Sequence, residues 1–264
     1  MLQKETVIQN YPINWIIRLH GSREQIPGAE DRYGQDRKQM TAGGEYCMNK
    51  TRGWNYMCLA LYAFAGLGLE ALLAFLIEPF LYRSAMSEWT VLQNIVHWII
   101  TCVLWGIVIV LLIKQAKHKY GFDVFAKSGK MKPWQWAVAG ACLIFTLSVS
   151  YIDWGGFKIV KEFYYNGVLK FIFQYIYYVF ETGLFTLIIV FGQKAFEKWF
   201  GNSQIPYGGI VVALTWGMGH ILTKGSLSAG LLAALSGFIY GVTYLLANRN
   251  IKKTYLLLFV MFVL

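Results

Sequence analysis

The residues best suited to chemistry in this chain are the few ionisable side chains that lie inside long apolar stretches. They are Glu70, Glu78, His97, Glu181 and His220. An ionisable group in the hydrocarbon of a membrane is costly unless it is paired or reached by water. These five positions are therefore the first candidates for function.

Glu181 and His220 lie in two successive apolar segments, 171–193 and 207–223. If the segments cross a bilayer in opposite directions, both side chains lie roughly 18–20 Å from the same membrane face, at 1.5 Å per residue. The carboxylate would then act as a general base on water, and the imidazole would bind an oxyanion or a metal. A buried Glu–His hydrogen bond that only fixes the register of the helices explains the same pattern.

The other three positions have simpler explanations. Glu78 precedes Pro79 near the end of its segment, which favours an interfacial position. His97 stands beside Trp98 and is expected to be interfacial or hydrogen-bonded. Glu70 lies in mid-segment, where a protonated carboxyl would bond to a neighbouring helix, or would supply an additional carboxyl to a site.

The composition defines the elements that must position these groups. Of the 264 residues, 56% are hydrophobic and 14% charged, whereas a soluble domain carries roughly 25% charged residues. The four cysteines form no CxxC or Cys/His cluster, which argues against a disulfide framework or a zinc site. The sequence predicts an all-α, polytopic transmembrane helix bundle of about seven spans. The expected spans are 54–82, 91–113, 134–152, 171–193, 207–223, 227–247 and 254–264.

The distribution of positive charge predicts the orientation. The net charge is +10. With residues 1–53 as a cytoplasmic arm and 54–264 as the transmembrane domain, nineteen Lys and Arg residues lie inside and five outside. The five outside are Arg83, Lys158, Lys161, Lys170 and Lys224. This bias predicts a multi-pass protein of a bacterial plasma membrane, in contact with membrane lipids, and explains the basic charge without nucleic acid.

Three segments in the second half of the chain resemble a known family. They read YYVFETGLFTLII around Glu181, VALTWGMGHILTKG around His220, and then GLLAALSGFIYGVTYLLANRNI. In this order they are similar to the CPBP family of intramembrane endopeptidases, which includes CAAX prenyl proteases and bacteriocin-processing or bacteriocin-immunity proteins. The resemblance covers about residues 115–260 and implies a CPBP-like core.

The first motif of that family is two consecutive Glu residues, three further residues and an Arg. Glu181 matches the first Glu, and Phe185 matches the aromatic residue before the Arg. Thr182 and Thr186 stand in place of the second Glu and the Arg. The resemblance therefore implies a catalytic Glu181 without the partners that the family gives it.

The second motif, an aromatic residue followed four positions later by a His, is matched by Trp216 and His220. The third motif, a His with Asn or Asp four positions later, is expected near residues 257–262, where the chain reads LLFVMF. In the family the Glu activates a water, and the histidines and Asn stabilise the tetrahedral intermediate or hold a metal. A divalent metal between Glu181 and His220 alone is poorly supported, because catalytic zinc usually takes three protein ligands.

Two functions follow, and the residues leave enzymatic activity open. The first is an endopeptidase that cleaves a peptide or a lipidated C-terminus, with Glu181 and His220 as catalytic residues, Phe185, Trp216 and Glu70 in support, and no cofactor. It predicts a water-accessible cavity that leads from both catalytic residues to the cytoplasmic side. The second is a catalytically inactive member of the same fold that binds and regulates a partner membrane protein, in cell-envelope work or peptide immunity. A small transporter or channel would need a continuous polar path, which five scattered ionisable groups hardly provide.

Overall fold

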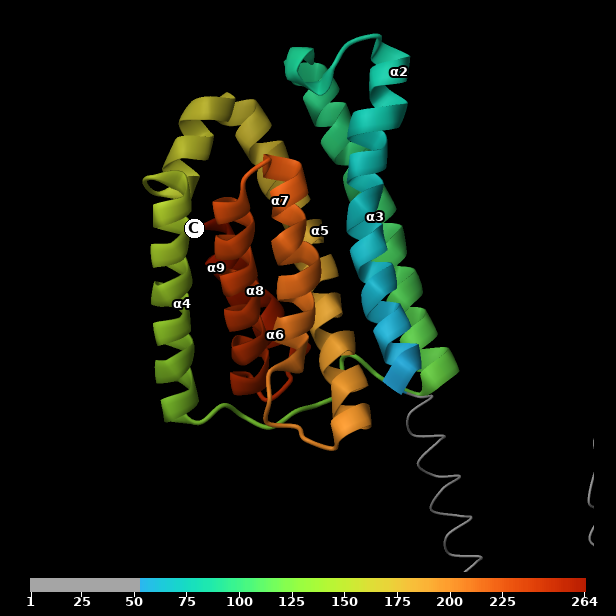
Figure 1. The fold of residues 1–264 in the computed structure, drawn as a ribbon, viewed down its shortest axis with the longest axis vertical. Helices are drawn as coiled ribbons and strands as arrows, with labels where there is room; N and C mark the ends of the chain where they lie inside the picture. Colours follow the sequence, from blue (N-terminus) through green and yellow to red (C-terminus); the bar gives the residue numbers. More distant parts are fainter. Residues whose placement is uncertain (1–52) are drawn as a thin grey trace, which may run out of the picture. The chain divides into compact units, whose positions relative to one another are not determined.

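The computed structural model describes residues 53–264, which form helices joined by short loops and contain no strand in that range (Figure 1). The all-α prediction is confirmed for this part of the chain. The predicted arm, residues 1–53, lies outside the described residues except for Gly53. The helices are Gly53–Tyr82, which includes η2 (Leu73–Ile77) and α2 (Glu78–Tyr82), then η3 (Met86–Glu88), α3 (Val91–Tyr120), α4 (Pro133–Trp154), α5 (Lys158–Phe200), α6 (Tyr207–Val212), η4 (Ala213–Gly217), α7 (Met218–Lys224), α8 (Leu227–Leu246) and α9 (Ile251–Val263).

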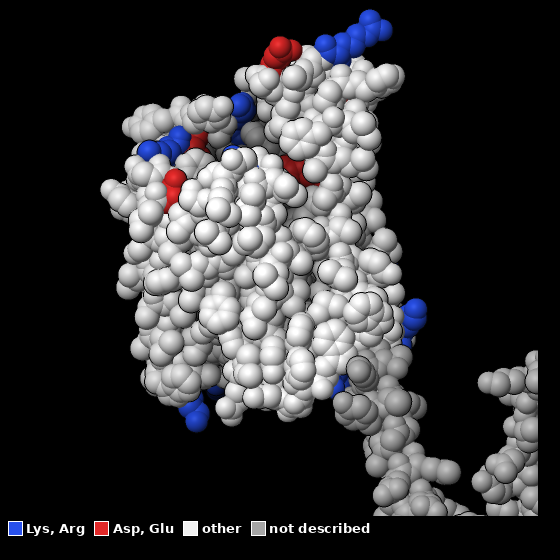
Figure 2. Space-filling model, in the orientation of Figure 1, with Lys and Arg blue, Asp and Glu red and all other residues white. Residues whose placement is uncertain are grey.

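Five of these helices are long and apolar enough to cross a membrane: Gly53–Tyr82, α3, α4, α5 and α8. The predicted count of about seven is not confirmed. The segment 207–223 is divided among α6, η4 and α7, and α9 has only 13 residues. A helix of that length covers about 20 Å, less than the roughly 30 Å of a hydrocarbon core. Figure 2 shows charged side chains mostly at the two ends of the described part, with an uncharged belt between them.

Small residues let α8 pack against α6 and η4 with their backbones in contact. A Cβ added to Gly241 of α8 would collide with the backbone of Gly209 in α6. About two turns further along the same contact, a Cβ on Gly217 would meet the Cα of Ala234 at 2.5 Å. This close approach holds η4 against α8 and so determines where Trp216 points.

A bend in α5 brings a basic residue back over the bundle. Gly167 has φ 67° and ψ 172°, a conformation that residues with a Cβ rarely adopt. The residues before Gly167 run across one end of the bundle, and those after it run along its length (Figure 1). Lys158, predicted to lie in an outside loop, instead begins α5 and is buried, because its ammonium reaches the carbonyl oxygen of Phe262 in α9.

Candidate functional site

A cavity of about 760 Å³ lies between the helix Gly53–Tyr82, α4, α5, α7, α8 and α9. Most of its wall is apolar, and nine ionisable residues also line it. They are Glu70, Asp153, Lys158, Tyr177, Tyr178, Glu181, His220, Lys224 and Tyr240. A mainly apolar pocket of this size with a few convergent polar groups is the usual form of a binding site.

Trp216 joins the two residues that the sequence predicts to act together. Its indole Nε1 donates a hydrogen bond to Glu181 Oε1 at 2.9 Å, and its carbonyl oxygen lies 2.9 Å from His220 Nδ1. Because a carbonyl oxygen only accepts, His220 Nδ1 carries the proton, and Nε2 has a free lone pair when the ring is neutral. The Trp216 and His220 rings pack edge to face, with centroids 4.7 Å apart.

Glu181 is only 9% exposed, and this small exposure is to the cavity that it lines with His220. Its second oxygen, Oε2, makes no hydrogen bond to another of residues 53–264, and neither does His220 Nε2. One oxygen of Glu181 is thus held by Trp216, and the other is free to contact a water or a ligand in the cavity.

A π-helical turn sets the position of Trp216. In η4 the backbone N–H of Met218 bonds to the carbonyl of Ala213, five residues back. A π turn inserts one residue into an α-helix, changes the direction of the side chains beyond it, and occurs frequently at functional sites. Trp216 lies inside this turn, and His220 lies three residues after the end of the turn.

Phe185 supports the site from behind and does not line the cavity. Its fully buried ring packs against Trp216, Tyr240 and Phe262, with centroid separations of 5.0, 5.4 and 5.5 Å. Thr182 and Thr186, which occupy the positions of the second Glu and the Arg in the family motif, are also buried, and their hydroxyls have no partner among the described residues.

Glu70 lines the same cavity but lies beside His97. Glu78 and His97 lie beside each other, so His97 is hydrogen-bonded, which is one of the two alternatives expected for it. Both are almost fully buried, and His97 Nδ1 lies 2.5 Å from Glu78 Oε2. The sequence places these three residues in two separate segments and offers no reason to group them.

Lys158 is the site residue that the sequence analysis missed. Its ammonium donates to the carbonyl oxygen of Phe262 at 2.9 Å and lies over the rings of Tyr178 and Phe262, 4.4 and 4.0 Å from their centroids. Glu162, one turn further along α5, accepts hydrogen bonds from Tyr175 and Tyr178. The four-residue spacing of Lys158 and Glu162 in the segment FKIVKEF was the available signal.

The cavity leads from Glu181 toward one end of the described part of the chain. It reaches from Glu181 to Asp153, Lys158 and Lys224, which are close to the loops that follow α4 and α7. Figure 2 shows the hollow near this end of the described part. The charge count predicts that this is the outer end, whereas the hydrolase hypothesis predicts a cavity that leads to the cytoplasmic side. His220 lies close to this end because α7 ends at Lys224, four residues after His220.

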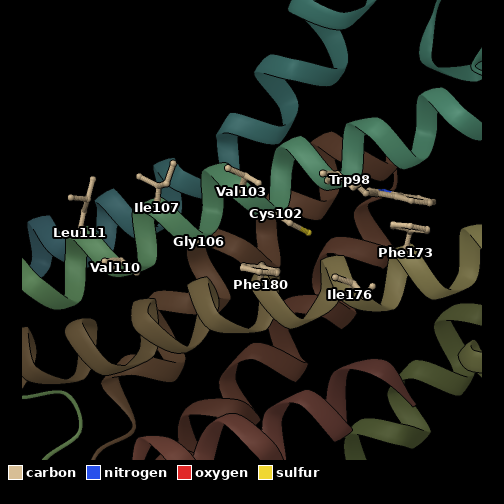
Figure 3. A pocket seen from close by; sticks show the side chains of 11 residues that line it. Trp98, Cys102, Val103, Gly106, Ile107, Val110, Leu111, Phe173, Ile176 and Phe180 are labelled. Atoms are coloured by element: carbon tan, nitrogen blue, oxygen red, sulfur yellow. The ribbon is translucent and has the colours of Figure 1, made fainter.

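A second cavity, of about 600 Å³, lies between α3 and α5 and is lined by apolar side chains (Figure 3). Residues of both helices line it, among them Trp98, Val103 and Ile107 of α3 and Ile176 and Phe180 of α5. None of the residues that line it is acidic or basic. The acid–base chemistry of the described residues is thus concentrated in the first cavity.

No protein-family model matches the chain, and neither the curated proteins nor the solved structures contain a significant match. The resemblance to the CPBP family rests on the three sequence segments alone. Within residues 53–264 no group of three or more His, Cys, Asp or Glu residues is arranged to hold a metal ion.

Proposed function

We propose that the protein is an intramembrane endopeptidase with a CPBP-like core, and that Glu181 is its general base. The observation that supports this most directly is the state of the Glu181 carboxyl. Trp216 holds one oxygen, while the other is unpartnered at the wall of a cavity that it shares with His220. A carboxylate oriented in this way in a largely apolar cavity is well suited to take a proton from water.

In this reaction Glu181 Oε2 removes a proton from a water molecule, whose oxygen attacks the carbonyl carbon of the substrate. The protonated Glu181 then returns the proton to the leaving nitrogen, and the C–N bond breaks. His220 carries its proton on Nδ1 and therefore has a lone pair at Nε2. This Nε2 would accept a hydrogen bond from the water and so orient it. It would donate to an oxyanion only as the imidazolium.

Lys158 is a cation in the cavity wall that is close enough to Glu181 for their charges to interact. Its place beside Phe262 is of interest because the third family motif, which this chain lacks, is expected in that part of α9. We therefore assign to Lys158 the electrostatic stabilisation of the oxyanion. The proposed substrate is a peptide or a lipidated C-terminus.

The test compares membranes of host cells that lack the protein with membranes that contain wild type, Glu181→Gln or His220→Gln at matched levels. Membrane peptides are followed by mass spectrometry. Glu88→Gln is the control, because Glu88 is an exposed carboxylate that does not line the cavity. We expect a peptide that accumulates without the protein, and whose cleavage falls about a hundredfold or more in Glu181→Gln but not in Glu88→Gln.

The second candidate function is a catalytically inactive protein of the same fold that regulates a partner membrane protein. The observation in its favour is that Thr182 and Thr186 point into the core and that α9 contributes Met261 and Phe262 to the cavity. Only one carboxylate and one imidazole of the family set would remain. Normal function of both Glu181→Gln and His220→Gln would exclude the hydrolase and favour this alternative.

A further inference from the structure

A second group of titratable residues lies in the wall of the cavity, apart from Glu181 and His220. His97 of α3 stands between two carboxyls of the helix Gly53–Tyr82. Its Nδ1 is 2.5 Å from Glu78 Oε2, and its Nε2 is 3.8 Å from Glu70 Oε1. His97 and Glu78 are 1% and 2% exposed, whereas the side chain of Glu70 is 31% exposed and lines the cavity. The group thus has a buried end and an end in the cavity.

The local backbone brings the two carboxyls to the same side of their helix. In an uninterrupted α-helix, the eight residues from Glu70 to Glu78 would turn the second side chain about 80° from the first. The intervening η2 is a π turn, in which the N–H of Glu78 bonds to the carbonyl of Leu73. One inserted residue takes back about 100°, which leaves the two side chains about 20° apart. Both carboxyls therefore face His97.

Two buried polar atoms in this group have no hydrogen-bond partner among the described residues: His97 Nε2 and Glu78 Oε1. An unpaired buried nitrogen is costly, and Nε2 points to a carboxyl that is slightly too far for a hydrogen bond. A small movement of the partly exposed Glu70 side chain, or a water between them, would satisfy it. The gap between His97 and Glu70 is therefore the place where a proton can be exchanged.

Charge balance defines what the group can hold. When His97 Nδ1 carries the ring proton, Glu78 Oε2 accepts a hydrogen bond from it as a carboxylate. Two ionised carboxylates beside a neutral imidazole would place two negative charges close together, one of them buried, which is disfavoured. One further proton, on Glu70 or on His97 Nε2, leaves a net charge of −1 in either position. Moving it breaks the Glu70 O–H bond and forms the His97 Nε2–H bond, with no change in total charge.

We propose that Glu70, His97 and Glu78 form a proton-exchange site in the cavity wall. One proton is shared between Glu70 Oε1 and His97 Nε2, and Glu70 exchanges it with water that enters the cavity. Glu78 is a positioning residue, which fixes the tautomer of His97. The site is independent of the proposed peptide hydrolysis, because holding and exchanging the proton needs no substrate.

The neighbouring elements contribute few other charges. The uncharged ring of Trp89 covers His97, with centroids 5.4 Å apart. Tyr82 lies near Glu78 on the same helix. On α5, Tyr177 and Glu181 are the titratable groups close to Glu70. No Lys or Arg is paired with Glu70 or Glu78 in the described part of the chain, so His97 is the group that balances their charge.

The test follows the protonation of His97 directly in the full-length protein in lipid nanodiscs. The chain has four histidines, so replacing His20, His118 and His220 with Gln leaves His97 as the single ¹⁵N-labelled imidazole. Its two nitrogen shifts are measured by NMR from about pH 5 to 9. The variants Glu70→Gln, Glu78→Gln and the control Glu88→Gln are made in this background.

We expect Nδ1 to stay protonated throughout and Nε2 to gain a proton as the pH falls. Glu70→Gln should lower the midpoint by about one pH unit or more, because the imidazolium loses an adjacent carboxylate, and Glu88→Gln should leave it unchanged. In infrared spectra, a protonated carboxyl band should disappear in Glu70→Gln. An unchanged midpoint in Glu70→Gln, or an unaltered carboxyl band, would overturn the proposal. Neither readout depends on whether the protein cleaves peptides.

Discussion

The contact between α6 and α8 leads to a prediction whose size can be worked out from the structure. Gly241 and Gly209 approach so closely that a Cβ on Gly241 would collide with the Gly209 backbone. Backbone cannot rotate out of the way as a side chain can. Gly241→Ala should therefore force the two helices apart, close to the η4 turn that carries Trp216.

The matched control is Gly140→Ala in α4, because a Cβ at Gly140 would have no heavy atom within 4 Å. Both substitutions place Ala in a helix, which is worth about 1 kcal/mol relative to Gly. Only Gly241→Ala adds the overpacking cost, about 1–3 kcal/mol. The free energy of unfolding of Gly241→Ala should thus be about 1–3 kcal/mol lower than that of Gly140→Ala, while Gly140→Ala should be at least as stable as wild type.

The assay is reversible unfolding of the full-length protein in mixed micelles by increasing the fraction of dodecyl sulfate. Helix content is followed by circular dichroism, and tertiary structure by tryptophan fluorescence. Comparing the two Gly→Ala variants cancels the change in helix propensity. Equal unfolding free energies for Gly241→Ala and Gly140→Ala would refute the close contact between α6 and α8.

Two further predictions concern the core and a loop. Trp105→Ala should lower the unfolding free energy by about 3–5 kcal/mol in the same titration, because the Trp105 ring is fully buried. The control Trp134→Ala changes a position that is 57% exposed and should alter the unfolding free energy by about 0.5 kcal/mol or less. Similar losses in the two variants would contradict the packing of Trp105. The backbone N–H of Phe125 and the ammonium of Lys117 hold the pKa of Asp123 below its usual value. Ionised Asp123 therefore stabilises the loop fully above the ordinary Asp pKa of about 3.9. This stabilisation is lost as the pH falls through the lower pKa of Asp123 in the folded protein. An NMR titration of the Asp123 carboxyl with a midpoint at or above the ordinary Asp pKa would contradict the prediction.

Much of the secondary structure could be predicted from local sequence alone. Apolar runs of about 20 residues must satisfy their own backbone hydrogen bonds in a membrane, and a helix does so within one segment. The runs at 91–113 and 134–152 are such cases, and both are helical. The boundaries were less accurate, because helices such as α3 continue through polar residues that no apolar run includes.

The same local reasoning selected Glu181 and His220, because an ionisable residue in an apolar run is visible without any tertiary structure. The resemblance to the CPBP family motifs added Trp216 and Phe185. It did not show that Trp216 would donate to the Glu181 carboxyl, or that Phe185 would pack behind Trp216 without lining the cavity. These relations depend on how α5 and η4 are rotated against each other.

The sequence by itself determined the helical class, the apolar segments and the ionisable residues inside those segments, since each follows from the chemistry of a short stretch of chain. Only the tertiary structure decided which of them meet. The π turn η2 aligns Glu70 with Glu78 on one face toward His97, and the bend at Gly167 returns Lys158 to the cavity. Both depend on a change in helix phase or direction that packing between distant segments stabilises, and a local hydropathy pattern does not contain it.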